Sequence, residues 1–306
     1  MASTKLLLAM VLLAFAPATP APAAQPTAAA TPQAEPPRIT TSYLVAPERG
    51  GACTLDNTMF DEQNKDAGAG FRYALPEYSQ VRFDVFVYPT GRLPHDQAVD
   101  LGMPAFKQGI EAAQSNGLIK DLAFLADEPF PLAAPQANAA PASASAPAAA
   151  DASADPMGAQ LARIVHAYQP VGRRLRMRDT LVDARGDFPI YSNGYLFYRQ
   201  LYYFKVRISA GRNLISEAEF EALADRAART LVSAIEVVNL GGCANKEVRL
   251  NPDAGPDAVA ETLMRKLAQF ESENCFADTQ AAKLDEKSER SSVVTIHFSA
   301  SDWKTE

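Results

Sequence analysis

Aromatic and cationic side chains are interleaved in the stretch YLFYRQLYYFKVRIS, from Tyr195 to Ser209. Surfaces that bind nucleic acids or glycans use this combination, because rings stack on ligand groups while Arg and Lys attract anions. A strand at the centre of a sheet that is buried on both faces has the same composition. The second interpretation is favoured here, and it predicts that the rings belong to the hydrophobic core.

A cationic sheet face is the main candidate for a binding site. The segment RRLRMRDTLVDARG carries alternate arginines, which is typical of a half-exposed strand. If the Tyr195–Ser209 stretch is the partner strand of a hairpin, its cations extend the same face. The candidate anion- or partner-binding residues are Arg174, Arg176, Arg178, Arg199, Lys205 and Arg207. Alternatively, these cations only solvate the sheet, with the acidic helix after Ser216 lying against them through weak exposed pairs.

Local motifs for hydrolytic or phosphate chemistry are missing from the sequence. It contains no GxSxG, SxxK or HExxH motif and no glycine-rich phosphate loop. The three histidines are far apart and lack a neighbouring ligand at zinc-binding spacing. We therefore predict no catalytic residue, no metal site and no cofactor. The alternative is an envelope hydrolase with a nucleophile that local motifs do not reveal, for example Cys275 with His297 as its base.

Three cysteines, Cys53, Cys243 and Cys275, allow three disulfide pairings. We favour Cys243 with Cys275, because these residues flank one predicted helix and their bond would close a loop. Cys53 would then be a free or an intermolecular thiol. The pairing of Cys53 with Cys243 stays open at this level.

The first residues predict export. Lys5 precedes the apolar run LLLAMVLLAF, and the small residues of APATPAPAA follow, which together resemble a cleavable signal peptide. The run is shorter than the roughly 20 residues that span a bilayer, so no transmembrane segment is expected in the mature chain. We predict an exported protein, periplasmic if its source is a Gram-negative bacterium and otherwise secreted.

The charge balance limits the class of partner. The chain has 29 Lys and Arg against 36 Asp and Glu, a net charge of -7, which argues against general binding of nucleic acids. An envelope protein or an anionic envelope component that meets a local basic patch is the partner that we expect.

Composition divides the chain into ordered and disordered parts. We predict a signal peptide over 1–24, a disordered Ala/Pro-rich leader over 25–39, and a single α+β domain over 40–306. A disordered insertion rich in Ala, Pro and Ser interrupts this domain at 133–156, where prolines would break any alanine helix. Whether the insertion separates two domains is open.

Hydrophobic periodicity predicts the elements of this domain. Strands are expected at GFRYAL, VRFDVFVYP, IKDLAFLAD, in the arginine-rich hairpin and at the C-terminal SVVTIHFS, which is expected to be an edge strand. Helices are expected over about 96–116, after the capping box of Ser216 and Glu219, and after Gly255 and Pro256. RGDFPIYSNG contains turn formers and is expected to connect the hairpin.

The order of these elements from Gly70 to Ile235 resembles the PsbP-like α/β/α sandwich of uncharacterised exported bacterial proteins. The resemblance rests on GFRYAL, VRFDVFVYP, the helix that follows, the hairpin ending in YYFKVRIS and the helix capped by Ser216. It implies an α/β/α sandwich with a largely antiparallel sheet and helices on its faces, and a non-catalytic binding or accessory module. The insertion and the last helix and strand depart from that pattern.

Overall fold

The structure is a computed structural model of the chain, and it describes residues 39–133, 170–184, 186–299 and 302. Contacts divide the chain into Met1–Glu35 and Pro36–Glu306, and every described residue belongs to the second unit. The predicted signal peptide, the leader up to residue 38 and the insertion from residue 134 onward lie outside the described residues.

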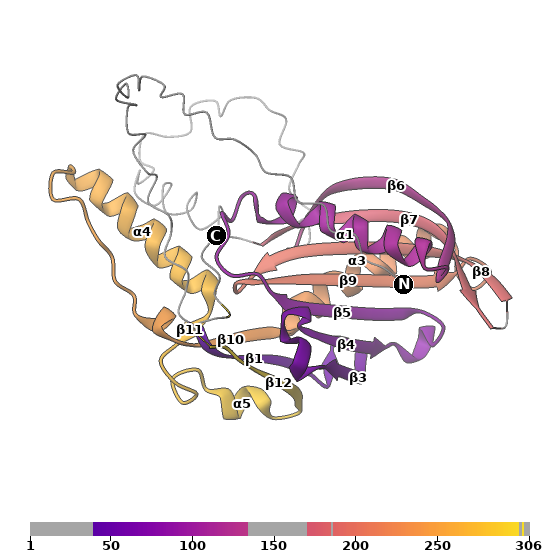
Figure 1. Ribbon diagram of the computed structural model, residues 1–306, viewed down its shortest axis with the longest axis horizontal. Coiled ribbons are helices and arrows are strands. Elements are labelled where there is room, and N and C mark those ends of the chain that lie inside the picture. The colour runs from indigo at the N-terminus through magenta and orange to yellow at the C-terminus, as the bar shows by residue number, and fades with distance from the viewer. Residues whose placement is uncertain (1–38, 134–169, 185, 300–301, 303–306) are drawn as a thin grey trace, which may run out of the picture. The chain divides into compact units, whose positions relative to one another are not determined.

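An eight-stranded antiparallel sheet is the larger of two sheets (Figure 1). Its strand order is β2-β3-β4-β5-β9-β8-β7-β6, so that the β8–β9 hairpin lies near the centre. The strands are β2 (Arg49–Gly50), β3 (Cys53–Phe60), β4 (Ala69–Ala74), β5 (Arg82–Pro89), β6 (Ile119–Pro131), β7 (Val171–Asp183), β8 (Gly186–Arg199) and β9 (Tyr202–Gly211).

The smaller sheet has four strands in the order β11-β10-β1-β12. The pairing of β10 with β11 is parallel, whereas the other two pairings are antiparallel. The C-terminal strand lies at an edge, as predicted. The strands are β1 (Ile39–Pro47), β10 (Glu236–Gly241), β11 (Cys275–Phe276) and β12 (Ser291–His297).

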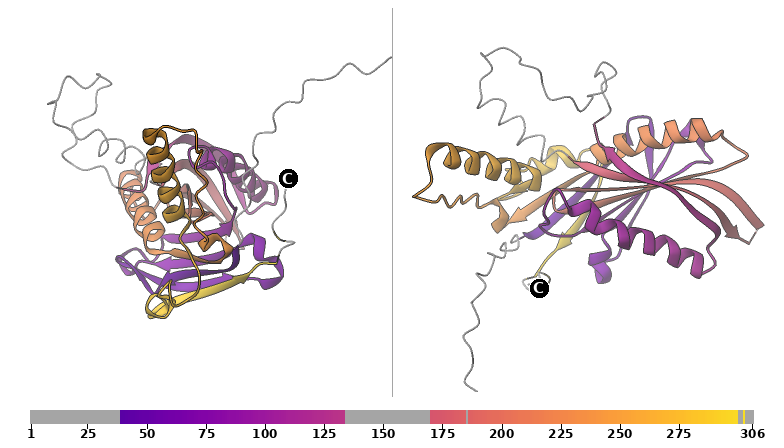
Figure 2. Two further views of the ribbon diagram at one scale, coloured as in Figure 1. Left: turned by 90° about the vertical axis from the view of Figure 1, so that its left-hand side faces the viewer. Right: turned by 90° about the horizontal axis from the view of Figure 1, so that it is seen from above.

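Two helices cover opposite faces of the larger sheet (Figure 2). Met103 and Phe106 of α1 share a buried cluster with Leu196, and this side is called the α1 face. Phe220 of α3 shares the main cluster with Phe204 and with residues of the smaller sheet, and this side is called the α3 face. The helices are α1 (Ala98–Ser115), α3 (Glu217–Ala234), α4 (Pro256–Glu273) and α5 (Leu284–Ser288), with short 3-10 turns η1 (Glu62–Ala67), η2 (Pro76–Tyr78) and η3 (Gly242–Ala244).

Helix boundaries follow the local signals in the sequence. The backbone N–H of Glu219 donates to the Ser216 hydroxyl, and the Glu219 carboxylate accepts from the Ser216 backbone N–H, which completes the predicted capping box of α3. Pro256 occupies the first turn of α4, also as predicted. The predicted α+β class, with a largely antiparallel sheet and helices on its faces, is therefore confirmed.

The Tyr195–Ser209 stretch is a hairpin, so the prediction of one continuous strand was wrong. Strand β8 ends at Arg199, Gln200 and Leu201 form a two-residue turn with positive φ, and β9 begins at Tyr202. Such turns usually contain Gly, Asn or Asp, so the sequence carries no local signal for this one. The Gln200 side chain accepts from the Val237 backbone N–H at 2.8 Å, and the Gln200 carbonyl accepts from the Asn239 amide, so tertiary contacts hold the turn.

The preceding connection was also placed wrongly. Strand β7 pairs with β8 as far as Asp183 and Gly186, so DFPIYSNG belongs to a strand and does not form the turn. The rings of the hairpin lie in the interior, as predicted: Tyr195, Phe197, Tyr198, Tyr202, Tyr203 and Phe204 are buried.

Cys243 and Cys275 form a disulfide, which confirms the favoured pairing. Their Cα atoms are 5.9 Å apart, and the bond connects η3 to the short strand that follows α4. Cys53 is buried and free, and burial raises the pKa of its thiol. The bonded Cys275 cannot act as the nucleophile considered for the hydrolase alternative.

Candidate functional site

The six cations predicted to form one sheet face lie on two faces. The two-residue turn reverses the alternation after Arg199, so Lys205 and Arg207 point to the α1 face. Arg174, Arg176 and Arg178 point to the α3 face, because they pair in register with Tyr195, Asn193 and Tyr191 of β8.

On the α3 face, carboxylates surround the three arginines. Arg174 lies 2.5 Å from Glu128 and 2.7 Å from Asp225, and its side chain is 17% exposed. Arg176 and Arg178 approach Glu221 and Glu217 of α3 at 3.5 and 3.1 Å. The acidic helix lies against these arginines, as the solvation alternative described, but the pairs of Arg174 and Arg176 are partly buried where that alternative described exposed pairs. These guanidinium groups are engaged with the protein's own acids.

The Arg174 network continues into the core. Burial acts to lower the pKa of Arg174, but its bonds to Glu128 and Asp225 outweigh burial and raise this pKa. The Tyr195 hydroxyl donates to Asp225 at 2.8 Å, and the Asn193 amide donates to Glu221 at 3.0 Å. We interpret this cluster as a structural contact between α3 and the sheet.

Arg199 lies apart from both groups. Its Nη1 donates to the Val232 carbonyl of α3 at 2.5 Å, and its guanidinium lies 5.3 Å from the Phe204 ring centre. Burial lowers the pKa of Arg199. The side chain therefore packs inside the protein and does not extend either cationic surface.

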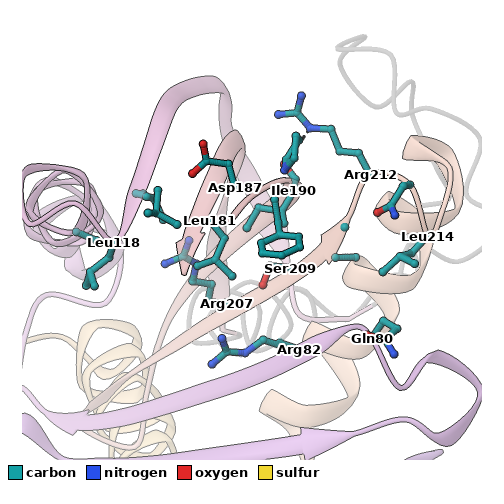
Figure 3. Close-up of a pocket in the computed structure, with 18 of the residues that line it drawn as sticks. Gln80, Arg82, Leu118, Leu181, Asp187, Ile190, Arg207, Ser209, Arg212 and Leu214 are labelled. Carbon is teal, nitrogen blue, oxygen red and sulfur yellow. Dashed lines mark hydrogen bonds between the residues drawn. The ribbon is translucent and has the colours of Figure 1, made fainter. Parts of the chain in front are cut away.

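A groove opens on the α1 face beyond the C-terminal end of α1 (Figure 3). Its volume is about 1160 Å³. Strands β5, β7, β8 and β9 supply its floor, and the residues after α1 and after β9 supply its sides. Three arginines line it, namely Arg82, Arg207 and Arg212.

Arginines outnumber carboxylates around this groove. Asp84 accepts from Arg72 Nε at 2.7 Å and lies 3.6 Å from Arg82 Nη2, so two guanidinium groups share one carboxylate. Arg207 lies 3.2 Å from Asp179, and no carboxylate of the described residues pairs with Arg212. Asp187 also lines the groove and pairs with Lys120, and the Arg212 guanidinium lies 5.7 Å from the Tyr191 ring centre. The arginines around the groove, with Arg72 beside it, still outnumber the carboxylates that they pair with, which makes the groove attractive to anions.

Asp179 is the buried member of this cluster. Its side chain is inaccessible to solvent, and its Oδ1 has no hydrogen-bond partner among the described residues. Burial raises the pKa of Asp179, although Arg207 and Arg212 act in the opposite direction. The ion pair with Arg207 is consequently a costly one, because a carboxylate with an unused acceptor is held away from water.

Lys205 precedes Arg207 on the same face of β9. Its ammonium lies 4.7 Å from the Phe106 ring centre of α1, and within the described part of the chain no carboxylate pairs with it. Burial lowers the pKa of Lys205, and the neighbouring Arg207 lowers it further. This ammonium packs against α1 and is not among the groups that line the groove.

The groove also has an apolar lining. Leu118, Phe188 and Leu214 are 58%, 40% and 53% exposed, so large hydrophobic side chains face solvent on several sides of one hollow. Ile119, Leu181 and Ile190 complete this lining. An exposed Lys120–Asp187 ion pair lies at the outer rim. Apolar surface next to uncompensated cations is suited to an amphipathic anionic ligand.

Sequence reasoning located Arg207 and missed Arg82, Arg212 and the exposed leucines. Arg82 appears as an ordinary polar position of an alternating strand, and Arg212 and Leu214 lie in a loop. These residues meet only through the pairing of β5 with β9, which local patterns do not reveal.

The described ranges contain neither a membrane-spanning helix nor a metal-binding cluster. None of the helices there combines the length and apolar character needed to cross a bilayer. Within the same ranges, no group of three or more His, Cys, Asp or Glu side chains is arranged to hold a metal ion.

Comparison with known proteins finds a weak likeness of fold. No family model matches the chain, and no curated protein matches it. The solution structure of cyanobacterial PsbP (CyanoP) from Synechocystis sp. PCC 6803 matches with a TM-score of 0.32 and 11% sequence identity. The match covers 64% of this chain and 92% of that chain. The weak PsbP-like resemblance is therefore confirmed.

Proposed function

We propose that this protein is an exported, non-catalytic binding or accessory module that holds an anionic envelope partner in the groove of the α1 face. The observation that carries the proposal is the charge of the groove, where Arg82, Arg207 and Arg212 lie beside exposed apolar side chains and Arg72 shares Asp84 with Arg82. The groups that converge there are ones that bind, namely guanidinium forks and aliphatic or aromatic surface.

The compartment is part of the proposal. The disulfide between Cys243 and Cys275 supports an oxidising environment, because such bonds persist mainly outside the cytoplasm. The apolar run after Lys5 and the small residues that follow it support export through a signal peptide. The partner would then be a protein or another anionic component of the same compartment.

Site-specific photo-crosslinking in the native envelope tests this function. A photoreactive amino acid replaces Leu214 in one variant and Leu118 in another, since both side chains are exposed at the groove. We expect crosslinked adducts from both positions. Their yield should fall as salt rises from about 0.1 to about 1 M, because dissolved ions screen the attraction between the groove cations and an anionic partner.

Two arginine substitutions serve as the matched comparison. Arg82→Gln removes a groove cation whose side chain is 52% exposed, whereas Arg249→Gln removes one that is 90% exposed and does not line the groove. Adducts should fall in Arg82→Gln and persist in Arg249→Gln. Adducts that respond to neither salt nor Arg82→Gln would contradict the proposal.

A further inference from the structure

Strand register gives the groove a cationic inner end. Asp84 pairs in register with Arg207, and Arg82 pairs with Ser209, which follows Arg207 on the same face of β9. Arg82, Arg207 and Ser209 are therefore neighbours on the floor of the groove (Figure 3). Two guanidinium groups and one half-buried hydroxyl converge there, and all of them can donate hydrogen bonds to an anion.

The charge at this inner end is one that a single anionic group would neutralise. Arg72 and Arg82 share Asp84, at 2.7 and 3.6 Å. Arg207 lies 3.2 Å from Asp179. Three guanidinium groups and two carboxylates leave one positive charge, so the complementary ligand carries one negative charge.

The outer part of the groove offers apolar surface. Ile190 pairs in register with Gly211, and Phe188 pairs with Leu181 one alternation further out. Leu214 lies over the same floor, since a Cβ atom added at Gly211 would be 3.0 Å from its Cδ1. All of these positions are further along the strands than the inner cations, so the groove changes from cationic to apolar in one direction.

The charges of the outer part are already engaged. Asp187 pairs with Lys120 at the rim. Arg212 donates from its Nε to the Ile190 carbonyl at 3.1 Å, and its guanidinium lies 5.7 Å from the ring centre of Tyr191, a residue of the α3 face. A second acidic group on the ligand would meet Asp187 and apolar side chains here, which disfavours ligands with two acids.

We infer that the occupant is a small amphiphile with one acidic head and an aliphatic chain, a long-chain carboxylic acid in its simplest form, an inference that rests on the proposed function. Its carboxylate accepts from Arg82, Arg207 and Ser209, because guanidinium groups donate paired hydrogen bonds to carboxylates. Its chain covers the apolar positions. From Ser192, which pairs with Ser209, to Phe188 is a distance of four residues, or roughly 13 Å along β8. The hollow of about 1160 Å³ has room for an entire molecule of this kind.

Isothermal titration calorimetry on the purified full-length chain tests this ligand class with decanoate and three probes that each change one feature. Decanol lacks the charge, acetate lacks the chain, and decanedioate carries a second acid at the far end. We expect decanol to bind roughly tenfold more weakly than decanoate, because it loses charge-assisted hydrogen bonds. Acetate should bind at least roughly a hundredfold more weakly, because it buries almost no apolar surface. Decanedioate should bind roughly tenfold more weakly, because its second carboxylate leaves water without a partner.

Two variants with matched controls locate the head and the chain. Arg82→Gln should weaken decanoate by roughly tenfold and leave decanol unchanged. Leu214→Asn should weaken decanoate and decanol alike, by roughly fivefold. Arg249→Gln and Leu250→Asn remove exposed side chains that do not line the groove, and they should leave both affinities unchanged.

The comparison of probes on the unchanged chain decides the ligand class even if a variant fails to fold, which circular dichroism shows. Equal affinity for decanoate and decanol, no measurable binding of decanoate, or tighter binding of decanedioate or of phosphatidylglycerol vesicles would overturn the inference. If photo-crosslinks then still depended on Arg82, the groove would remain the binding site and only the ligand class would be wrong. Loss of those crosslinks as well would remove the proposed function.

Discussion

Two groups of arginines, one in strand β7 on the α3 face and one around the groove, pair with carboxylates to different extents. On the α3 face, Arg174, Arg176 and Arg178 meet four carboxylates, from Glu128, Glu217, Glu221 and Asp225. Around the groove, Arg72, Arg82 and Arg207 share Asp84 and Asp179, and Arg212 lies over the Tyr191 ring. Elsewhere on the α1 face, Arg173 pairs with Asp100 and Asp127.

The contrast suggests a criterion for separating structural arginines from ligand-binding ones, namely how many carboxylates of the protein each guanidinium group already pairs with. An arginine that is already bonded to several carboxylates gains little from an added anion, because its donors are in use. A guanidinium that shares a carboxylate, or has none, retains donors and potential for a ligand. The conspicuous run of alternate arginines in β7 is therefore the less promising surface.

The largest expected difference between the faces concerns stability. Arg174→Met should lower the free energy of unfolding by about 2 to 3 kcal/mol, because it leaves Glu128 and Asp225 partly buried without their cation. Arg82→Met should lower it by less than about 1 kcal/mol, because Arg72 still pairs with Asp84 and Arg82 is half-exposed. Urea unfolding of the two variants measures both effects.

The test is whether Arg174→Met loses more unfolding free energy than Arg82→Met. A loss for Arg82→Met that equals or exceeds the loss for Arg174→Met would show that the α1 face also uses its arginines for stability. The distinction between compensated and uncompensated cations would then fail. Arg249→Met provides the baseline for removing an arginine that is 90% exposed.

Local sequence signals predicted several helices and strands, but they did not predict the features that depend on tertiary contacts. The capping box fixed the start of α3, and alternation located β5, β6 and β12, because these features depend on neighbouring residues alone. β1 and β10 were not assigned, although both are largely buried. The Gln200–Leu201 turn was missed because contacts with Val237 and Asn239 hold it, far along the chain.

The candidate site was only partly predictable for the same reason. The sequence identified Arg207 as a cation on a strand, but it assigned that residue to the face of Arg174. The error follows from the missed turn, since a two-residue connection reverses which side of β9 each residue faces. Arg82 and Arg212 join Arg207 only through strand pairing and the loop after β9.

A smaller effect on stability compares the helices that cover the two faces. Ser216 caps α3 with its side chain, whereas Gln97 at the start of α1 makes no such bond. Ser216→Ala should therefore lower the free energy of unfolding by about 1 kcal/mol, and Gln97→Ala should change it very little. Equal losses in chemical denaturation would show that the cap of α3 contributes nothing specific.

The smallest effect concerns how stability changes with pH on the α1 face. Burial raises the pKa of Asp179 in the folded state, so over the interval between its unfolded and folded pKa values the folded protein binds more protons at this site. The contribution of Asp179 to stability is then fully present below the unfolded pKa and is lost as pH rises through the folded pKa. Asp179→Asn removes this titration, so the difference in unfolding free energy, wild type minus variant, should decrease as pH rises from about 4 towards neutrality. Urea unfolding at several pH values measures the difference, and a value that stays constant or increases would show that the Arg207 guanidinium outweighs burial at this buried carboxylate.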